Sequence, residues 1–103
     1  MEGKDSDDLV FEVFQLNDLQ REIFQVIRDR QMTVKQIKEE VDRSRSTVQR
    51  ALQEMLDKDL ILREGKTDKT VYYVYTTLPW GEIKELTRES IEEWYRQADE
   101  KLS

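Results

Sequence analysis

The segment from Arg43 to Arg50, which reads RSRSTVQR, carries the most chemically suggestive side chains of this sequence. It holds three arginines, three hydroxyl side chains, one glutamine and no acid. Arginine donates paired hydrogen bonds to guanine, glutamine pairs with adenine, and serine or threonine bonds either bases or phosphates. The segment therefore indicates nucleic-acid recognition, against the alternative that it is only the capped, solvated start of a helix.

Residue types needed for other chemistries are missing. The chain has no cysteine and no histidine, which excludes disulfides, thiol catalysis, imidazole bases and most zinc sites. Acidic pairs at 39–40 and 92–93 could act as acid and base, but such runs usually form the solvated side of a helix. The glycines are scattered at positions 3, 65 and 81, so there is no glycine-rich phosphate loop. We expect no enzymatic activity, no cofactor and no metal.

Charge is unevenly distributed along the chain. The formal net charge is −6, but residues 19–78 hold twelve bases and ten acids. Residues 1–18 hold six acids and one base, and residues 79–103 hold seven acids and four bases. Exposed charges farther apart than a Debye length of about 8–10 Å are largely screened. The local field of the basic middle, rather than the net charge, therefore decides whether phosphate is attracted.

Length and composition predict one domain without a membrane anchor. A chain of 103 residues buries a single core without help from metals or disulfides. No stretch approaches the roughly 20 apolar residues of a membrane span, and the N-terminal MEGKDSDD lacks the apolar run of a signal peptide. We therefore expect a cytoplasmic protein with no membrane partner.

Helix signals surround the basic segment. Asn17 and Thr33 each precede a glutamine by three residues, a capping-box spacing that predicts helices starting at about Asp18 and Val34. A third helix is expected over about residues 44–58. Only a three- or four-residue polar turn separates the second helix from the third, which makes a helix-turn-helix unit.

Extended chain and a last helix follow. A polar turn at 65–69 separates Leu60–Leu62 from the β-branched and aromatic run 70–76, which predicts an antiparallel hairpin, the wing. Pro79 is favoured in the first turn of a helix that runs to about Lys101. This order is the winged helix-turn-helix: an α+β, mainly α fold with a three-helix core, a two-stranded wing and a long C-terminal helix.

The third helix of such a fold presents its N-terminal residues to the major groove of DNA. Val48 and Leu52 are expected to point into the core, and wing residues are expected to touch phosphate or the minor groove. The expected DNA-binding residues are Lys35, Arg43, Ser44, Arg45, Ser46, Thr47, Gln49, Arg50, Gln53, Arg63, Lys66, Thr67 and Lys69.

The C-terminal helix carries a stripe of apolar side chains that is longer than a core of three helices needs. We expect it to form a homodimer through Ile83, Leu86, Ile91, Trp94, Tyr95, Ala98 and Leu102. Two recognition helices about 34 Å apart would then read a pseudo-palindromic site. The alternative is that this helix folds back on its own domain.

The expected division is a disordered acidic tail (1–8), a winged-helix domain with an N-terminal arm (9–78) and a C-terminal dimerisation helix (79–103). Part of the arm, Leu9–Leu16, is an apolar patch whose length does not decide between a short helix and extended chain. The same patch is a candidate to join the dimer interface.

From about residue 16 to 102 the sequence resembles the TrmB-type and MarR-type winged-helix regulators common in archaea. The likeness lies in VKQIKEEV (34–41), RSRSTVQRAL (43–52), LDKDLIL (56–62) and the strand that ends YVY (73–75). It implies a small transcriptional regulator that binds double-stranded DNA. The sugar-binding domain of larger TrmB-type proteins has no counterpart here, so the likeness implies no sugar ligand.

Two alternatives to DNA binding stay open. A winged-helix module that binds protein is favoured by the acidic flanks of the chain. An RNA-binding domain is suggested only by the tyrosine-rich strand. Alternation places Tyr73 and Tyr75 on one face of this strand and Tyr72 on the other. Because one face must cover the helices, we expect most of these rings to be structural.

Overall fold

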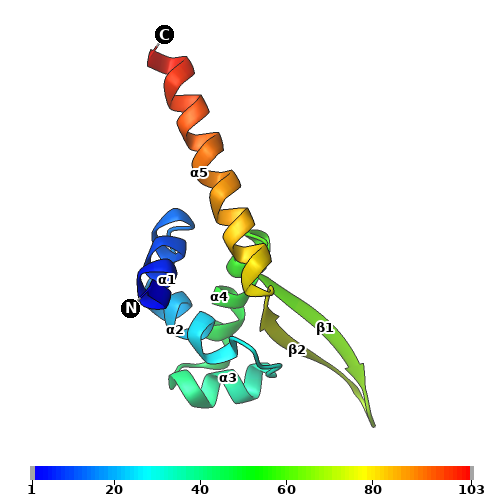
Figure 1. Cartoon of the computed structure of the whole chain (residues 1–103). Helices are drawn as coiled ribbons and strands as arrows, with labels where there is room; N and C mark the ends of the chain where they lie inside the picture. Colours follow the sequence, from blue (N-terminus) through cyan, green and yellow to red (C-terminus); the bar gives the residue numbers. More distant parts are fainter. Residues whose placement is uncertain (1, 103) are drawn as a thin grey trace. The chain divides into compact units, whose positions relative to one another are not determined.

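The computed structural model describes residues 2–102, with side chains described from Asp7 onward. Backbone contacts divide the chain into two units, residues 16–78 and the combination of residues up to 15 with those from 79. The elements, labelled in Figure 1, are α1 (Glu2–Val13), α2 (Asp18–Ile27), α3 (Val34–Val41), α4 (Arg45–Asp57), β1 (Ile61–Thr67), β2 (Val71–Thr77) and α5 (Trp80–Leu102). The predicted order of helices and strands, and with it the α+β, mainly α fold, is confirmed.

Helices α2 and α3 begin where the capping signals predicted. The Gln20 backbone N–H donates to Asn17 Oδ1 at 2.8 Å, and the Asn17 N–H donates to Gln20 Oε1 at 3.1 Å. Thr33 and Gln36 exchange the equivalent pair at 3.2 and 2.9 Å. Each box satisfies backbone donors that a helix start leaves without a partner.

The turn between α3 and α4 is made without glycine. Asp42 ends α3 in the left-handed region at φ 56°, with its backbone N–H bonded to the Lys38 carbonyl. Aspartate visits this region more readily than most residues because its short side chain bonds locally. Ser44 then caps α4 by accepting the Thr47 backbone N–H at 3.3 Å. A three-residue turn, 42–44, therefore suffices to redirect the chain.

The wing hairpin is longer than predicted. Strands β1 and β2 pair antiparallel from Ile61–Thr77 to Thr67–Val71. The polar turn predicted at 65–69 is thus wrong, because residues 65–67 belong to β1 and the connection spans only residues 68–70. The β-branched and aromatic residues 71–73 favour extended backbone, and they carry the glycine and lysine opposite them into the ladder.

Backbone hydrogen bonds pair the base of the hairpin with the segment that precedes α3 and extend the hairpin by one step beyond its strands. Met32 and Tyr75 form an isolated antiparallel bridge, with N–O distances of 3.0 and 2.7 Å. The Leu78 N–H donates to the Leu60 carbonyl at 3.2 Å. The short segment before α3 is therefore paired with the edge of β2.

The core of residues 16–78 is formed by the inner faces of α2, α3 and α4 together with the base of the hairpin. Its fully buried side chains include Ile23, Phe24, Ile27, Ile37, Val48, Leu52, Met55 and Leu60. Each such side chain contributes on the order of 1.5–3 kcal/mol when removed from water. Because Val48 and Leu52 are among them, the predicted orientation of α4 is confirmed.

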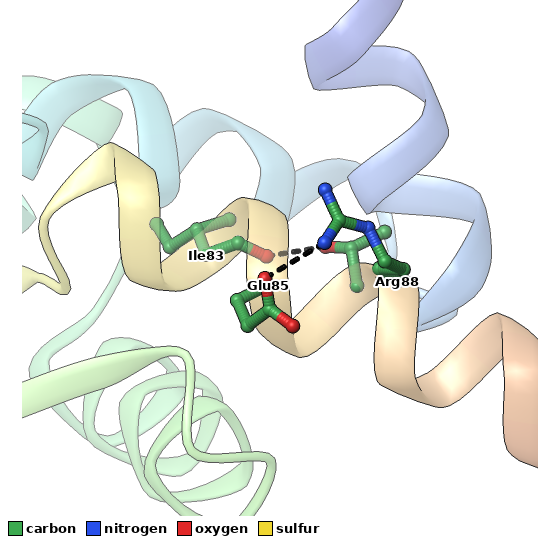
Figure 2. Close-up of polar contacts among 4 residues, drawn as sticks. Ile83, Glu85 and Arg88 are labelled. Atoms are coloured by element: carbon green, nitrogen blue, oxygen red, sulfur yellow. Dashed lines mark hydrogen bonds and ion pairs between the residues drawn. The ribbon is translucent and has the colours of Figure 1, made fainter.

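The second unit pairs α1 with α5. Val10 and Phe11 of α1 are buried, as are Ile83 and Thr87 of α5. Figure 2 shows the first half of α5, where Thr87 Oγ1 donates to the Ile83 carbonyl at 2.7 Å and Arg88 Nη1 lies 3.0 Å from Glu85 Oε1. The first bond lets a buried hydroxyl satisfy itself within its own helix.

Two parts of the expected division need correction. Helix α1 begins at Glu2, so the expected tail over residues 1–8 is largely helical. Val10 and Phe11 anchor this helix by burial, and a nucleated helix extends toward its end at little further cost. Residues 9–15 of the expected arm belong with α5 instead of with residues 16–78. None of the helices in the described part combines the length and apolarity of a membrane span.

Candidate nucleic-acid interface

The outer face of α4 is open to solvent along its first half. Val48, Ala51 and Leu52 are buried on the inner face. With those positions inside, the helical repeat turns the predicted contact residues outward. Exposed on α4 and its cap are Arg43, Ser44, Arg45, Ser46, Thr47, Gln49, Arg50 and Gln53. The structure therefore brings the predicted recognition residues together on one surface, which we call the α4 face.

Cations on and beside the α4 face form no ion pair with the described residues. Ion pairs among the described residues join Arg30 to Glu40, Lys66 to Glu64, Arg88 to Glu85 and Arg96 to Glu93. By contrast, Lys35, Arg43, Arg45 and Arg50 lie within 4.0 Å of no carboxylate in the described part of the chain. Four unpaired positive charges beside two helix N-termini make a favourable environment for phosphate.

Several polar side chains of the α4 face already have partners. Ser44 Oγ donates to Thr47 Oγ1 at 2.8 Å and lies 3.4 Å from Ser46 Oγ. Gln53 Nε2 donates to Asp57 Oδ1 at 3.1 Å. The hydroxyls of Ser44, Ser46 and Thr47 therefore interact with one another at the start of α4. The Gln53 amide is held toward the end of the helix. Arg45, Gln49 and Arg50 keep their hydrogen-bonding capacity for a ligand.

The four predicted wing residues have different surroundings. Arg63 lies over the ring of Tyr73, with its guanidinium carbon 4.6 Å from the ring centroid. Lys66 Nζ lies 3.5 Å from Glu64 Oε2. Thr67 is the last residue of β1, and Lys69 lies in the exposed connection between the strands. Of the two wing lysines, only Lys69 keeps an unpaired charge among the described residues.

A groove of about 380 Å³ lies between the starts of α3 and α4 and strand β2. We call it the α4–wing groove, and its lining residues are Thr33, Val34, Lys35, Arg45, Gln49, Val71, Tyr72, Tyr73 and Tyr75. It joins predicted contact residues of the helices to tyrosines that were expected to be structural. Only Tyr75 meets that expectation, because Tyr72 and Tyr73 are 41% and 48% exposed.

The misassignment of Tyr72 and Tyr73 has a geometric cause. Alternation gave their faces, but it did not give the length of the hairpin beyond the helices. Burial along β2 changes from exposed at residues 71–73 to buried at residues 74 and 75. The residues of the exposed half line the α4–wing groove, so open space rather than close packing separates them from α3 and α4. The sequence signal for this exposure lay on the opposite strand. Tyr73 pairs with Gly65 and Tyr72 with Lys66.

The apolar stripe of α5 is exposed only in part. Ile83 is 1% exposed, so its expected role in a dimer interface is wrong: it is already buried within its own chain. Leu86 and Ala98 are half-buried. The remaining members are open to solvent: Ile91 (40%), Trp94 (69%), Tyr95 (70%) and Leu102 (86%).

Comparison with known proteins assigns the chain to a family. Residues 11–80 match the family described as sugar-specific transcriptional regulator TrmB. The chain belongs to the TrmB family. The matched region includes α2, α3, α4 and both strands of the wing. The predicted family resemblance is thereby confirmed, and the family consists of transcriptional regulators and not of enzymes.

A curated relative of this TrmB-family chain is 34% identical over 73 residues: the uncharacterized protein MJ1503 of Methanocaldococcus jannaschii. That alignment covers 69% of this chain and 55% of the relative, so the chain spans about half the length of this relative.

Solved structures share the winged-helix fold with this TrmB-family chain. A possible transcriptional regulator from Methanosarcina mazei Go1 superposes with a TM-score of 0.80 at 16% identity, covering 94% of this chain and 85% of the other. MepR of S. aureus, solved in complex with DNA, superposes with a TM-score of 0.64 at 20% identity, covering 98% and 85%. At these identities the likeness establishes the fold.

Proposed function

We propose that this TrmB-family protein binds double-stranded DNA and regulates transcription as a homodimer, with α4 in the major groove and the wing on the backbone or minor groove. The observation that carries the proposal is the set of unpaired cations on and beside the α4 face. Elsewhere on the chain, arginines of α5 are paired with glutamates of the same helix. Lys38, Lys84 and Lys101 are likewise near no carboxylate of the described residues. The described arginines that make no ion pair, side-chain hydrogen bond or ring contact are Arg43, Arg45 and Arg50, and all three lie on the surface that winged-helix proteins turn toward DNA.

Within this proposal the residues of the α4 face divide by reach and chemistry. Arg45, Gln49 and Arg50 are exposed long side chains suited to base edges in the major groove. Arg43 and Lys35 flank the helix starts and suit phosphates, as do Lys69 and Arg63 on the wing. Ser44, Ser46 and Thr47 fix the start of α4 and offer further contacts to the backbone.

Homodimerisation is proposed through the exposed part of the α5 stripe. Trp94 and Tyr95 are each about 70% exposed near the C-terminal end, and large exposed aromatic side chains of this kind mark interaction surfaces. A two-fold dimer would bury the same patch on both copies. It would also present two α4 faces to a pseudo-palindromic site with half-sites about 34 Å apart.

Selection of duplexes from a random library with the purified full chain tests the proposal. The wild-type protein is expected to enrich an inverted repeat and to bind it more tightly than it binds random duplex. Gln49→Ala is expected to cost about 1–3 kcal/mol on the selected site if it reads a base. Gln97→Ala is the matched control, since Gln97 is an exposed glutamine of α5 that bonds Glu93.

The outcomes separate the candidate functions. Failure to bind any duplex at low salt would refute DNA binding and favour a protein-interaction module. Tighter binding to single-stranded RNA than to duplex DNA would favour an RNA-binding domain. Binding of DNA with equal affinity by wild type and Gln49→Ala would refute the reading role assigned to Gln49.

A further inference from the structure

The α4–wing groove has two chemically different walls. Lys35 and Arg45 supply positive charge from the starts of α3 and α4, and Gln49 adds a neutral hydrogen-bonding group. The opposite wall, on β2, consists of Val71 and the tyrosines. A cationic wall faces an apolar, aromatic wall across a space of about 380 Å³.

Tyr73 is held in place on the aromatic wall. Its register partner on β1 is Gly65, and a Cβ added to that glycine would lie 3.5 Å from the Tyr73 ring. The ring thus lies against backbone that carries no side chain. From the same face of the hairpin, the Arg63 guanidinium lies over the ring at 4.6 Å. Cation–π contact of this kind restrains both partners.

Despite these contacts, Tyr73 keeps 48% of its surface exposed. The hydroxyl of an exposed tyrosine can donate a hydrogen bond, and its ring can pack against an apolar surface. The cationic wall can bind phosphates and the aromatic wall can pack against deoxyriboses. The groove is therefore complementary to a nucleic-acid strand, in which these two groups alternate. Stacking on a base is less suitable, because bases inside a duplex are reached by a ring only when they are unstacked or flipped.

We propose that the α4–wing groove holds one sugar–phosphate strand of duplex DNA, with the Tyr73 ring packed on a deoxyribose and its hydroxyl donating to a phosphate. Lys35 would neutralise a phosphate of the same strand from the opposite wall, where Arg45 adds positive charge beside the base edges that it is proposed to read. This inference rests on the proposed function and adds to it a neutral aromatic contact that carries no sequence information.

The test compares Tyr73→Leu and Tyr73→Phe with wild type by fluorescence anisotropy, on the selected duplex and on a random-sequence duplex. Tyr73→Leu is expected to weaken binding of both duplexes by about tenfold, equivalent to about 1.4 kcal/mol. Tyr73→Phe is expected to weaken both by a smaller factor, because it loses only the hydroxyl. Since neither variant changes charge, the slope of log K against log salt is expected to stay constant.

Leu62→Ala is the matched control. Leu62 is 49% exposed, lies on the opposite face of the hairpin by register, and does not line the groove. Its truncation is expected to leave affinity for both duplexes unchanged. Circular dichroism of every variant checks the fold, and Tyr73→Phe alone carries the test if Tyr73→Leu proves unstable.

A purely positioning role for Tyr73 gives a different pattern. If the ring acts only by holding Arg63, Tyr73→Leu lowers the salt slope as Arg63→Gln does, and the double variant binds no more weakly than Arg63→Gln alone. That pattern, or unchanged binding by both Tyr73 variants, overturns the proposed contact while leaving DNA binding intact. Weakening confined to the selected duplex overturns it too, since it indicates base reading. Absence of duplex binding by the wild type instead refutes the proposed function.

Discussion

Replacing Lys69 by glutamine is expected to reduce the salt dependence of DNA binding, whereas Lys66→Gln is expected to leave it nearly unchanged. Both lysines belong to the wing hairpin and carry the same formal charge. Lys66 Nζ, however, lies 3.5 Å from Glu64 Oε2, while Lys69 has no carboxylate within pairing distance in the described part of the chain. A phosphate near Lys66 meets a pair of little net charge, whereas a phosphate near Lys69 meets a full positive charge.

The size of the effect follows from counterion release. Each phosphate neutralised on B-DNA contributes about 0.9 to the slope of log K against log salt. A homodimer carries every substitution twice, so Lys69→Gln is expected to reduce the magnitude of the slope by about 1.8. A single bound protomer would lose only about 0.9. The change in slope therefore shows whether Lys69 contacts phosphate and whether one or two protomers place their wings on the DNA.

Fluorescence anisotropy with the selected duplex, over about 50–200 mM salt, gives the slopes. Arg88→Gln serves as a further control because Arg88 is paired with Glu85 on α5 (Figure 2). Equal losses of slope for Lys66→Gln and Lys69→Gln would refute the reasoning that Glu64 neutralises its neighbour. Unchanged slopes for both would show that the wing does not approach phosphate.

Four further substitutions test the folding and assembly of the chain. Ser44→Ala removes the α4 cap and is expected to lower the free energy of unfolding in urea by about 1 kcal/mol; an unchanged midpoint would mean that the cap contributes nothing. Leu52→Ala empties a fully buried site and is expected to cost about 2–5 kcal/mol in the same assay. Gln20→Ala, which removes the buried donor to Glu54 Oε1 at 2.7 Å, is expected to cost about 1–3 kcal/mol. Trp94→Ala is expected to shift the chain from dimer to monomer in sedimentation equilibrium at unchanged helix content, and a persistent dimer would place the interface elsewhere.

The parts of the fold that sequence predicted well depend on local chemistry. Asn17 and Thr33 mark helix starts because their partners lie only three residues away, so the whole signal is contained in a short window. The spacing of Val48 and Leu52 likewise fixes which side of α4 is buried, and with it the side on which Arg45 and Arg50 lie. The α4 face was therefore predictable from residues 44–53 alone.

The parts that sequence predicted poorly depend on neighbours far along the chain. Ile83 looked like every other member of the α5 stripe, and only the three-dimensional structure distinguishes this buried position from the exposed Trp94. Tyr72 and Tyr73 looked structural because alternation says nothing of where the supporting helices end. The pairing of α1 with α5 joins residues from opposite ends of the chain, which no local pattern encodes.

The bridge between Met32 and Tyr75 restricts motion of the wing hairpin relative to α3. Its two backbone hydrogen bonds join the hairpin base to the segment that leads into α3. A hinge motion of the hairpin against α3 would have to break them together. The amide protons of Met32 and Tyr75 should accordingly exchange with deuterium about as slowly as those of the helical interior. A wing held in this way loses little conformational entropy when it meets a ligand.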